Sequence, residues 1–292
     1  MKYTDNEPEL LCQGYGLIEG PVWDGRRGLI FSDVLNGGVF CLDNRGTVNS
    51  IFEHRRGIGG MSLHSAGGLV VSGRNLAYKA FSGNASVTLL DNDADSGRVG
   101  FNDITTDHKG RIYAGSLGSS PVFDDGLEPR AGQLFLLDLD GAVHVVAEDI
   151  QLTNGLAFSP DGQTLYHSDS KRKTVFCYSV KSDGTLGAKT PFTLTARGVP
   201  DGLVVAEDGS VWVALADGGH GVSVFDAEGA EQSFIEISTP MCTSVCFGGD
   251  DLKDLYIVSG SHGADSESAG GVYRVRTTVA GLPVPLARVP VR

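Results

Sequence analysis

The sequence lacks any long apolar run. None approaches the roughly 18 consecutive residues that a membrane-crossing helix needs. The first ten residues, MKYTDNEPEL, also lack the apolar core of a signal peptide. We therefore expect a soluble protein with no membrane partner, located in the cytoplasm.

Positive charge is scarce as well. The 292 residues include 23 Lys and Arg against 36 Asp and Glu, a formal net charge of −13 at pH 7. Because contacts with a nucleic-acid backbone need clustered Lys and Arg, this balance argues against a nucleic-acid partner. The chain has no GxSxG nucleophile elbow, no GxGxxG motif and no phosphate loop, which argues against a serine hydrolase and against a nucleotide-binding protein.

The cysteines do not form a disulfide framework. They are five in number, which is odd, and they lie at irregular spacings that fit a reducing compartment. Cys242 and Cys246 could be taken for half of a zinc site. Because no CxxC or HxxxH motif accompanies them, we expect both to be small core residues.

Glycine, in contrast, is abundant. The 41 glycines are scattered along the whole chain and favour many short strands and turns over long helices. At 41% hydrophobic residues the chain can bury a substantial core. No stretch has the composition of a linker, so residues 1–292 are expected to form a single domain.

Six related stretches recur along the chain. Each has a head residue, a short alternating strand, a polar turn that contains Gly, and a second apolar strand. The heads stand at positions 19, 60, 102, 154, 201 and 243, so successive units are 41, 42, 52, 47 and 42 residues apart. This period, at about four strands per unit, predicts an all-β fold, a six-bladed β-propeller. The strand GVYRVRTT near the C-terminus is expected to close the ring with Leu10 to Gln13.

The unit from Thr153 to Asp169 contains two turn-forming pairs, Asn154-Gly155 and Asp161-Gly162. Asp161-Gly162 separates two apolar strands and is predicted to form a type I′ hairpin turn. Asn154 then lies about seven residues away, at roughly 20 Å and at the other end of the blade. Because the first strand of each propeller blade lines the central channel, the six heads should form a ring at one channel mouth.

Four of the six heads carry a side-chain carboxylate or carboxamide: Glu19, Asn102, Asn154 and Asp201. Asn or Asp before Gly can simply start a turn, but Glu is not a turn-forming residue. Converging carboxylates and carboxamides are hard ligands that suit Ca²⁺, Mg²⁺ or Mn²⁺. Three or four protein ligands leave coordination positions for water and substrate. The ring therefore predicts one divalent metal site at one mouth of the channel, arranged for metal-assisted hydrolysis.

Several of these stretches resemble the regucalcin/gluconolactonase (senescence marker protein, luciferin-regenerating-enzyme-like) family of six-bladed propellers. They are EGPVWD at 19–24, FNDITTDHKGRIYAGS at 101–116, TNGLAFSPDG at 153–162, PDGLVVAEDGSVWVA at 200–214 and CTSVCFGG at 242–249. The resemblance implies that Glu19, Asn154 and Asp201 hold the metal, with Asn102 completing the site or contacting substrate. It also implies that Asp201 is the catalytic acid/base and that the reaction is lactone hydrolysis. Ca²⁺ is the favoured ion, with Mg²⁺, Mn²⁺ or Zn²⁺ as alternatives.

The chain departs from the family pattern at two positions. Gly100 stands where the gluconolactone-type members have an Arg, two residues before Asn102, and Ser120 takes the place of a Glu on the next loop. These departures predict a lactone substrate other than the gluconolactone type, smaller or less hydroxylated. Nearby Arg98 could in principle substitute for the missing Arg.

The loops that follow each second strand are expected to surround the site. They are Arg74 and Asn75, Ser116 to Gly132, Ser168 and Asp169, Asp217 to Gly221, and Ser259 to Gly271. The spacing of the third unit, 52 residues, is about ten longer than those before it, and the excess falls in the loop Ser116 to Gly132. This loop is predicted to be a lid, although Asp124 and Asp125 in it could simply be solvated. Asn102, Ser120 and His220 are the predicted substrate-binding residues, and His262 is a further candidate.

The leading interpretation is thus a cytoplasmic, metal-dependent lactonase, a hydrolase of small-molecule lactones. Two alternatives stay open at this point. A phosphotriesterase could use the same metal on a P=O group. A non-catalytic propeller could bind Ca²⁺ or a small ligand, because a fold does not by itself establish chemistry.

Overall fold

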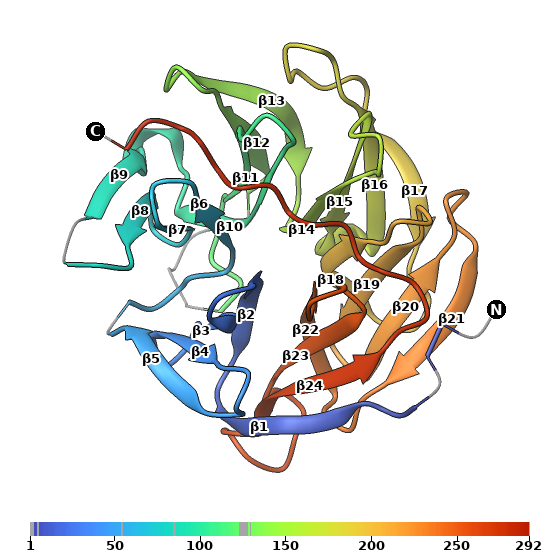
Figure 1. The fold of residues 1–292 in the computed structure, drawn as a ribbon. Coiled ribbons are helices and arrows are strands. Elements are labelled where there is room, and N and C mark those ends of the chain that lie inside the picture. The colour runs from blue at the N-terminus through green and yellow to red at the C-terminus, as the bar shows by residue number, and fades with distance from the viewer. Residues whose placement is uncertain are drawn as a thin grey trace.

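The computed structural model describes residues 3–4, 6–53, 55–83, 86–122, 128 and 130–291. Within these residues the chain forms six four-stranded antiparallel sheets, two 3₁₀ turns and no α-helix. The sheets stand like blades around a central channel (Figure 1). The predicted all-β, six-bladed propeller is confirmed. No helix in the described part of the chain has the length and apolar character to cross a membrane.

Each blade runs from an inner strand at the channel to an outer strand at the rim. Blade one consists of β2 (Ile18–Asp24), β3 (Gly28–Asp33), β4 (Val39–Leu42) and β5 (Val48–Phe52). Blade two consists of β6 (Met61–His64), β7 (Gly68–Val71), β8 (Leu76–Ala80) and β9 (Ser86–Leu90). Blade three consists of β10 (Gly100–Thr106), β11 (Ile112–Leu117), β12 (Gly132–Leu137) and β13 (Val143–Ile150). Blade four consists of β14 (Thr153–Phe158), β15 (Thr164–Asp169), β16 (Thr174–Ser179) and β17 (Thr190–Leu194). Blade five consists of β18 (Val199–Val205), β19 (Val211–Ala216), β20 (Gly221–Phe225) and β21 (Glu231–Glu236). Blade six consists of β22 (Met241–Gly248), β23 (Asp254–Gly260), β24 (Gly270–Arg276) and β1 (Glu9–Tyr15). The 3₁₀ turns are η1 (Ala94–Ser96) and η2 (Ser170–Arg172).

The two ends of the chain close the ring in the sixth blade. Strand β1 is the outer strand there and pairs antiparallel with β24, with Leu10 opposite Tyr273 and Gln13 opposite Gly271. This is the predicted pairing. Because the first and last strands share one sheet, backbone hydrogen bonds hold the ends of the ring together.

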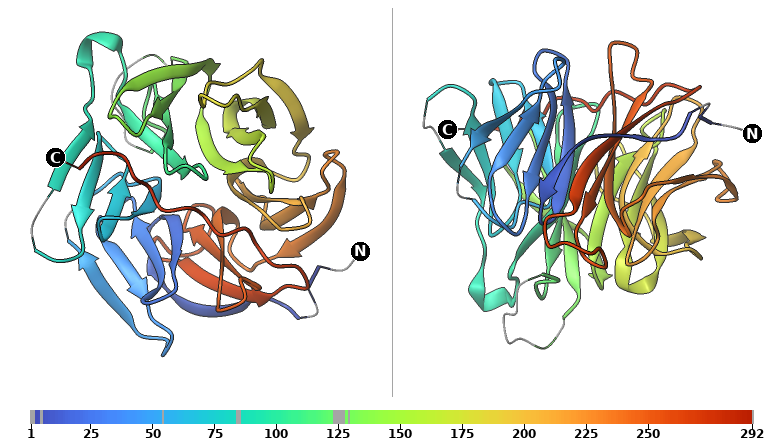
Figure 2. Two further views of the ribbon diagram at one scale, coloured as in Figure 1. Left: turned by 45° about the horizontal axis from the view of Figure 1, so that its top comes forward. Right: turned by 90° about the horizontal axis from the view of Figure 1, so that it is seen from below.

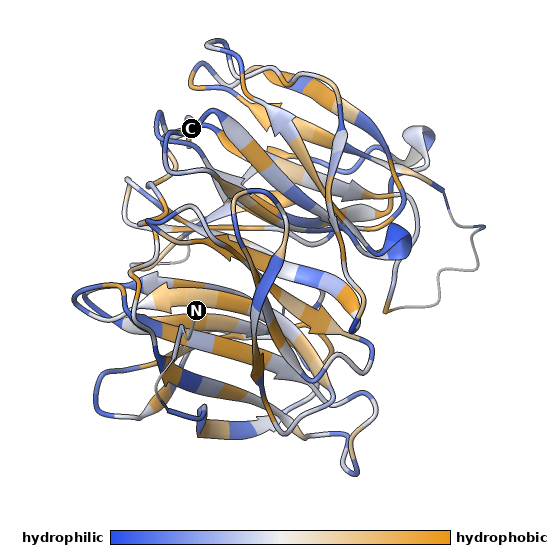
Figure 3. Ribbon diagram, turned by 90° about the vertical axis from the view of Figure 1, so that its right-hand side faces the viewer, coloured by the Kyte–Doolittle hydropathy of each residue, from blue (hydrophilic) through white to orange (hydrophobic). Residues whose placement is uncertain are grey.

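Apolar side chains pack between neighbouring blades. Trp212 of blade five is fully buried, and its ring meets those of Phe247 and Tyr3 edge-on at 5.2 and 5.3 Å. Cys242 belongs to the same cluster, and Cys246 is buried in the next one. Both cysteines are therefore core residues, as predicted. Figure 3 shows the underlying pattern, with hydrophobic positions concentrated along the strands and hydrophilic ones in the loops at both ends.

The six inner strands contact one another around the channel, and five of them share one irregularity. The pairing with the second strand shifts register at the head residue: between Glu19 and Val22 in β2, Phe101 and Ile104 in β10, Thr153 and Leu156 in β14, Pro200 and Leu203 in β18, and Cys242 and Ser244 in β22. A bulge redirects side chains out of the normal alternation. These bulges release the heads from the sheets at the channel.

The predicted hairpin turn in blade four lies at the predicted place but has a different form. The amide of Gly162 donates to the carbonyl of Ser159 at 2.8 Å, and Asp161 Oδ1 accepts from the Gln163 amide at 3.0 Å. Of the pair Asp161-Gly162, only Gly162 has positive φ, at 68°. The type I′ prediction is therefore wrong, because that turn needs positive φ at both central residues.

The chain beyond β24 crosses the channel mouth that lies opposite the head residues (Figures 1 and 2). We call residues 278–291 the strap. Its backbone hydrogen-bonds to three other blades: Leu282 N to Val205 O at 3.1 Å, Ala287 N to Leu63 O at 2.8 Å and Arg288 N to Gly110 O at 2.8 Å. The strap thus links blades two, three and five at the end away from the heads.

Removing β1 tests the ring closure. Deletion of residues 1–15 exposes the edge of β24 and removes Tyr3 from Trp212, so we expect the free energy of unfolding in urea to fall by at least about 3 kcal/mol. Glu9→Gln is the matched control. It breaks only the exposed ion pair of Glu9 with Arg274 and should cost less than about 1 kcal/mol. Equal stability of the truncated and intact chains would contradict closure by β1.

Candidate metal centre

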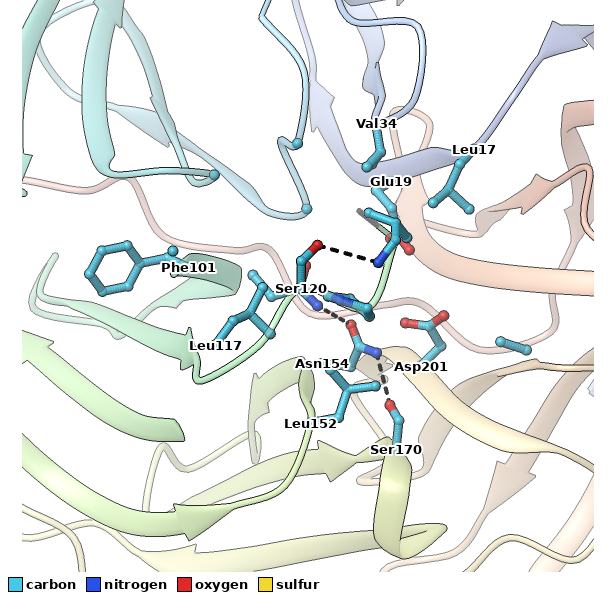
Figure 4. A pocket seen from close by; sticks show the side chains of 18 of the residues that line it. Leu17, Glu19, Val34, Phe101, Leu117, Ser120, Leu152, Asn154, Ser170 and Asp201 are labelled. Atoms are coloured by element: carbon cyan, nitrogen blue, oxygen red, sulfur yellow. Dashed lines mark hydrogen bonds between the residues drawn. The ribbon is translucent and has the colours of Figure 1, made fainter. Parts of the chain in front are cut away.

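A cavity of about 740 Å³ opens at the channel mouth where the heads lie, and all four carboxylate and carboxamide heads line it. Glu19 comes from blade one, Asn102 from blade three, Asn154 from blade four and Asp201 from blade five. Figure 4 shows Glu19, Asn154 and Asp201 converging, with Leu17, Val34, Leu117 and Leu152 around them. Residues up to 182 positions apart in the sequence, as 19 and 201 are, therefore meet at one point.

A chain of hydrogen bonds orients the two amide heads. Asn102 Nδ2 donates to Asn154 Oδ1 at 2.5 Å and to the carbonyl of Thr153 at 2.9 Å. Asn154 Nδ2 donates to Ser170 Oγ at 2.8 Å, and that hydroxyl donates to the carbonyl of Pro200 at 2.7 Å. Ser170 thus fixes which way the Asn154 oxygen points. No sequence pattern indicated Ser170, because it lies in η2, outside the repeated positions.

Asp201 is the most buried of the four carboxylate and carboxamide heads, with 5% of its surface exposed. Its Oδ1 is fully buried and has no hydrogen-bond partner. A buried carboxylate oxygen without a partner is costly, because nothing replaces the water it has lost. A cation in the cavity would supply that partner.

The pKa shifts of the buried carboxyl groups also favour a bound cation. Burial raises the pKa of Glu19 well above its usual range, and repulsion by Asp201 and Asp103 raises it further. Burial and the charge of Asp103 also raise the pKa of Asp201. Asp103 itself has its pKa raised to about 7 by burial. Within the described residues none of the three forms an ion pair with Lys or Arg, so a divalent ion would relieve a real repulsion.

Asp103 is a member of the cluster that the repeat did not reveal. In three other units the head is followed by glycine, at Gly20, Gly155 and Gly202, where neighbouring inner strands approach closely. A Cβ at Gly155, for example, would lie 2.4 Å from the amide nitrogen of Leu203. The third unit has Asp103 instead, and it lines a second cavity at the strap end of the channel. Because Asp103 stands where these three units have glycine, the sequence difference could have identified it.

The donor set fits a hard divalent cation. Glu19, Asn154 and Asp201 offer two carboxylates and one carboxamide to the cavity that all three line, and one Asp201 oxygen has no hydrogen-bond partner. In the part of the chain that the structure describes, no group of three or more His, Cys, Asp and Glu could hold a metal ion, so the candidate depends on the Asn154 amide beside the two carboxylates. The mixed carboxylate-amide cluster is therefore the candidate centre.

The remaining predicted site residues separate into two groups. Ser120 and His262 line the cavity. His220 does not: it lies in the turn between β19 and β20 with φ 56°, and its amide donates to the carbonyl of Pro240. Arg98 also lies outside the cavity lining, because its guanidinium stacks on Phe101 and Phe135 at 5.1 and 5.0 Å.

The long loop predicted as a lid is described only in part. Ser120, Pro121 and Val122 line the cavity, and the amide of Gln133 donates to Ser116 Oγ at the base of the loop at 2.9 Å. Asp124 and Asp125 lie outside the described residues. Closure of this loop over the site therefore stays a prediction.

The fold and the cluster together define a six-bladed propeller with a carboxylate-amide centre at one channel mouth. The chain belongs to the SMP-30/Gluconolactonase/LRE-like family, whose model matches residues 17–261.

Two curated relatives are lactonases by name. The chain is 32% identical over 284 residues to a 6-deoxy-6-sulfogluconolactonase of Pseudomonas putida, covering 92% of this chain and 94% of the relative. It is 30% identical over 285 residues to the pentonolactonase XacC of Haloferax volcanii, covering 91% and 93%.

Among solved structures, a calcium-binding protein, regucalcin, of Agrobacterium tumefaciens matches with a TM-score of 0.84 at 22% identity, over 97% of this chain and 98% of that one. At this identity, the likeness supports the fold alone.

Two substitutions test the candidate centre by calorimetric titration with Ca²⁺. Glu19→Gln should weaken binding by about a hundredfold or more, because it removes a charge as well as a ligand. Asn102→Ala should weaken it by about tenfold, because Asn102 mainly orients Asn154. A larger effect of Asn102→Ala would show that the charge of Glu19 does not hold the ion.

Asp103→Asn tests the cost of burying this carboxylate in the metal-free protein. The pKa of Asp103 is raised in the folded state from 3.8 to about 7, so this carboxyl costs no stability at low pH and destabilises the fold increasingly as pH rises toward 7. In EDTA, the variant should therefore match the parent near pH 4 and exceed it near pH 7.5 by about 1–3 kcal/mol. Thermal melts across this range measure the difference, and a constant difference would contradict this cost of burial.

Proposed function

We propose that this protein is a divalent-metal-dependent hydrolase that opens the ring of a lactone. The observation that carries the proposal is the buried, unpartnered Asp201 oxygen beside Glu19 and Asn154 in a cavity open to solvent. Membership of a family with lactonases among its curated members supports the reaction class. Five unpaired cysteines fit a reducing compartment such as the cytoplasm.

In the proposed reaction, Glu19, Asn154 and Asp201 would hold the ion. A bound divalent ion would supply Lewis-acid polarisation of the lactone carbonyl. Asp201 takes a proton from water as the water oxygen attacks the carbonyl carbon. The bond from that carbon to the ring oxygen then breaks, and the ring oxygen receives the proton. The products are one carboxylic acid and one hydroxyl on the same molecule.

Asn102 and Ser120 are the proposed substrate contacts. The Asn102 side-chain amide donates its hydrogen bonds to Asn154 and Thr153. Its Oδ1 can therefore accept a hydrogen bond from a substrate hydroxyl. Gly100 and Ser120 lack the charged groups expected for an unmodified gluconolactone, so we propose a different lactone. The cavity volume of about 740 Å³ leaves room for substituents on the ring.

A pH-drop assay tests the reaction class. The metal-loaded protein is offered glucono-δ-lactone, simple γ- and δ-lactones and a phosphotriester, with Ca²⁺, Mg²⁺, Mn²⁺ or Zn²⁺ added after EDTA treatment. Hydrolysis of lactones only, restored by one of these ions, supports the proposal. Hydrolysis of the phosphotriester alone would favour the phosphotriesterase alternative. Calcium binding without turnover of any compound would favour a binding protein.

Asp201→Asn should lower kcat by at least about a hundredfold, because it removes the base and preserves the size of the side chain. Asp217→Asn is the matched control: Asp217 lines the same cavity but lies in the exposed turn after β19, and kcat should change less than about threefold. Circular dichroism should show that both variants fold. If Asp201→Asn retained more than about a tenth of the parent kcat, Asp201 could not be the general base.

A further inference from the structure

The wall of the cavity carries a concentration of positive charge that the metal centre does not use. Arg56, Arg74, Lys171 and Lys173 line it, and all four are exposed. This is unexpected in a chain with a net charge of −13. Beyond the two carboxylates of the centre, Asp217 is the one acidic side chain among the described residues of the lining.

Arg74 occupies the space beside Gly100. The amide of Gly73 donates to Phe101 O at 3.1 Å and the amide of Phe101 donates to Gly73 O at 2.7 Å, which brings blade two against the start of β10. A Cβ at Gly100 would lie 2.7 Å from Gly73 O and 3.5 Å from the Cα of Arg74. No side chain fits at position 100. Arg74, on the adjoining loop, lines the same cavity as Gly100.

The loop that holds Arg56 packs closely against the loop that holds Arg74. A Cβ at Gly73 would lie 2.9 Å from the carbonyl oxygen of Gly57, the residue after Arg56. Arg55 fastens the loops together, since its Nη2 donates to the carbonyl oxygens of Ser72 and Asn75 and to Asn75 Oδ1, at 2.8 to 3.1 Å.

Arg56 and Arg74, in contrast, form no ion pair and no side-chain hydrogen bond within the described residues. Both guanidinium groups are therefore available to a ligand, and an oxyanion would give them a counter-charge while accepting paired N–H bonds.

Lys171 and Lys173 add positive charge from blade four, on the other side of Asn102. They flank the end of η2, and Lys173 terminates that turn in a left-handed conformation, with φ 50°. The same turn holds Ser170, which orients Asn154. Positive charge therefore flanks the metal centre on two sides and would draw an anion into a protein that otherwise repels it.

We propose that the substrate carries an oxyanion group outside the lactone ring, and that Arg74 and Arg56 bind it. This inference rests on the proposed function, since it names the class of lactone that the same cavity accepts. The group is a phosphate, sulfonate or carboxylate on a substituent of the ring. Arg74 is then a specificity-determining residue, which holds the end of the substrate away from the carbonyl that reacts.

The test compares 6-phosphoglucono-δ-lactone with glucono-δ-lactone, which have the same ring and differ in one charged group. The parent protein should favour the phosphorylated lactone by at least about tenfold in kcat/KM, and added NaCl should reduce the preference. Arg74→Gln should lower the ratio of the two kcat/KM values by about tenfold or more, and Arg56→Gln by a smaller factor. D-Glucaro-1,4-lactone, tested in parallel, distinguishes a carboxylate from a phosphate.

Arg45→Gln is the matched control, because Arg45 is exposed in the turn between β4 and β5, away from the cavity lining, and the change in net charge is the same. It should leave the ratio unchanged. Metal-dependent hydrolysis with no preference for the anionic lactones would overturn this inference while the lactonase function stands.

If no lactone is hydrolysed, the proposed function fails, and binding of 6-phosphogluconate against gluconate then decides on the oxyanion site. Tighter binding of 6-phosphogluconate that Arg74→Gln abolishes would support the site, and equal binding would refute it.

Discussion

Repulsion among buried carboxylates on the propeller axis is the constraint around which this molecule is organised. Glu19, Asp103 and Asp201 reach the channel from three different blades, and each has its pKa raised by burial. A single sheet could not bring such groups together and bury them. Six inner strands that converge on one axis can, because the closed ring and the apolar packing between blades hold every strand against its neighbours. The stability of the ring thus supports a centre that is itself unfavourable without a cation.

The repeat made the architecture predictable. Six heads at spacings of 41 to 52 residues gave the number of blades, and the pairing of Leu10 to Gln13 with the last strand followed from the need to close a ring. The heads meet in one cavity because they occupy equivalent positions in equivalent units. The detailed form of a turn was less accessible: the Asp161-Gly162 hairpin adopts one positive φ where two were predicted.

The residues that the sequence did not reveal share a physical cause: their roles depend on contacts between units. Ser170 acts through a hydrogen bond from one blade to the backbone of the next. Asp103 enters the channel because a bulge frees two consecutive residues of β10. Arg74 reaches the wall beside Gly100 through a two-hydrogen-bond bridge between blades. Comparing Gly100 with its family counterpart suggested a missing guanidinium, whereas the three-dimensional packing places the backbone of Arg74 beside Gly100.

The course of the strap also determines how the cavity is oriented when the protein is attached to a support through its C-terminal end. Its course across the far mouth carries the end of the chain to blades two and three, on the face opposite the cavity (Figure 2). A bead, an electrode or a fused domain joined to that end would therefore stand behind the propeller, with the substrate entrance turned toward bulk solution. Attachment through the turns beside Arg74 or Lys171 would do the opposite and cover the entrance. The geometry of one extended segment thus makes the C-terminus the natural handle for immobilisation.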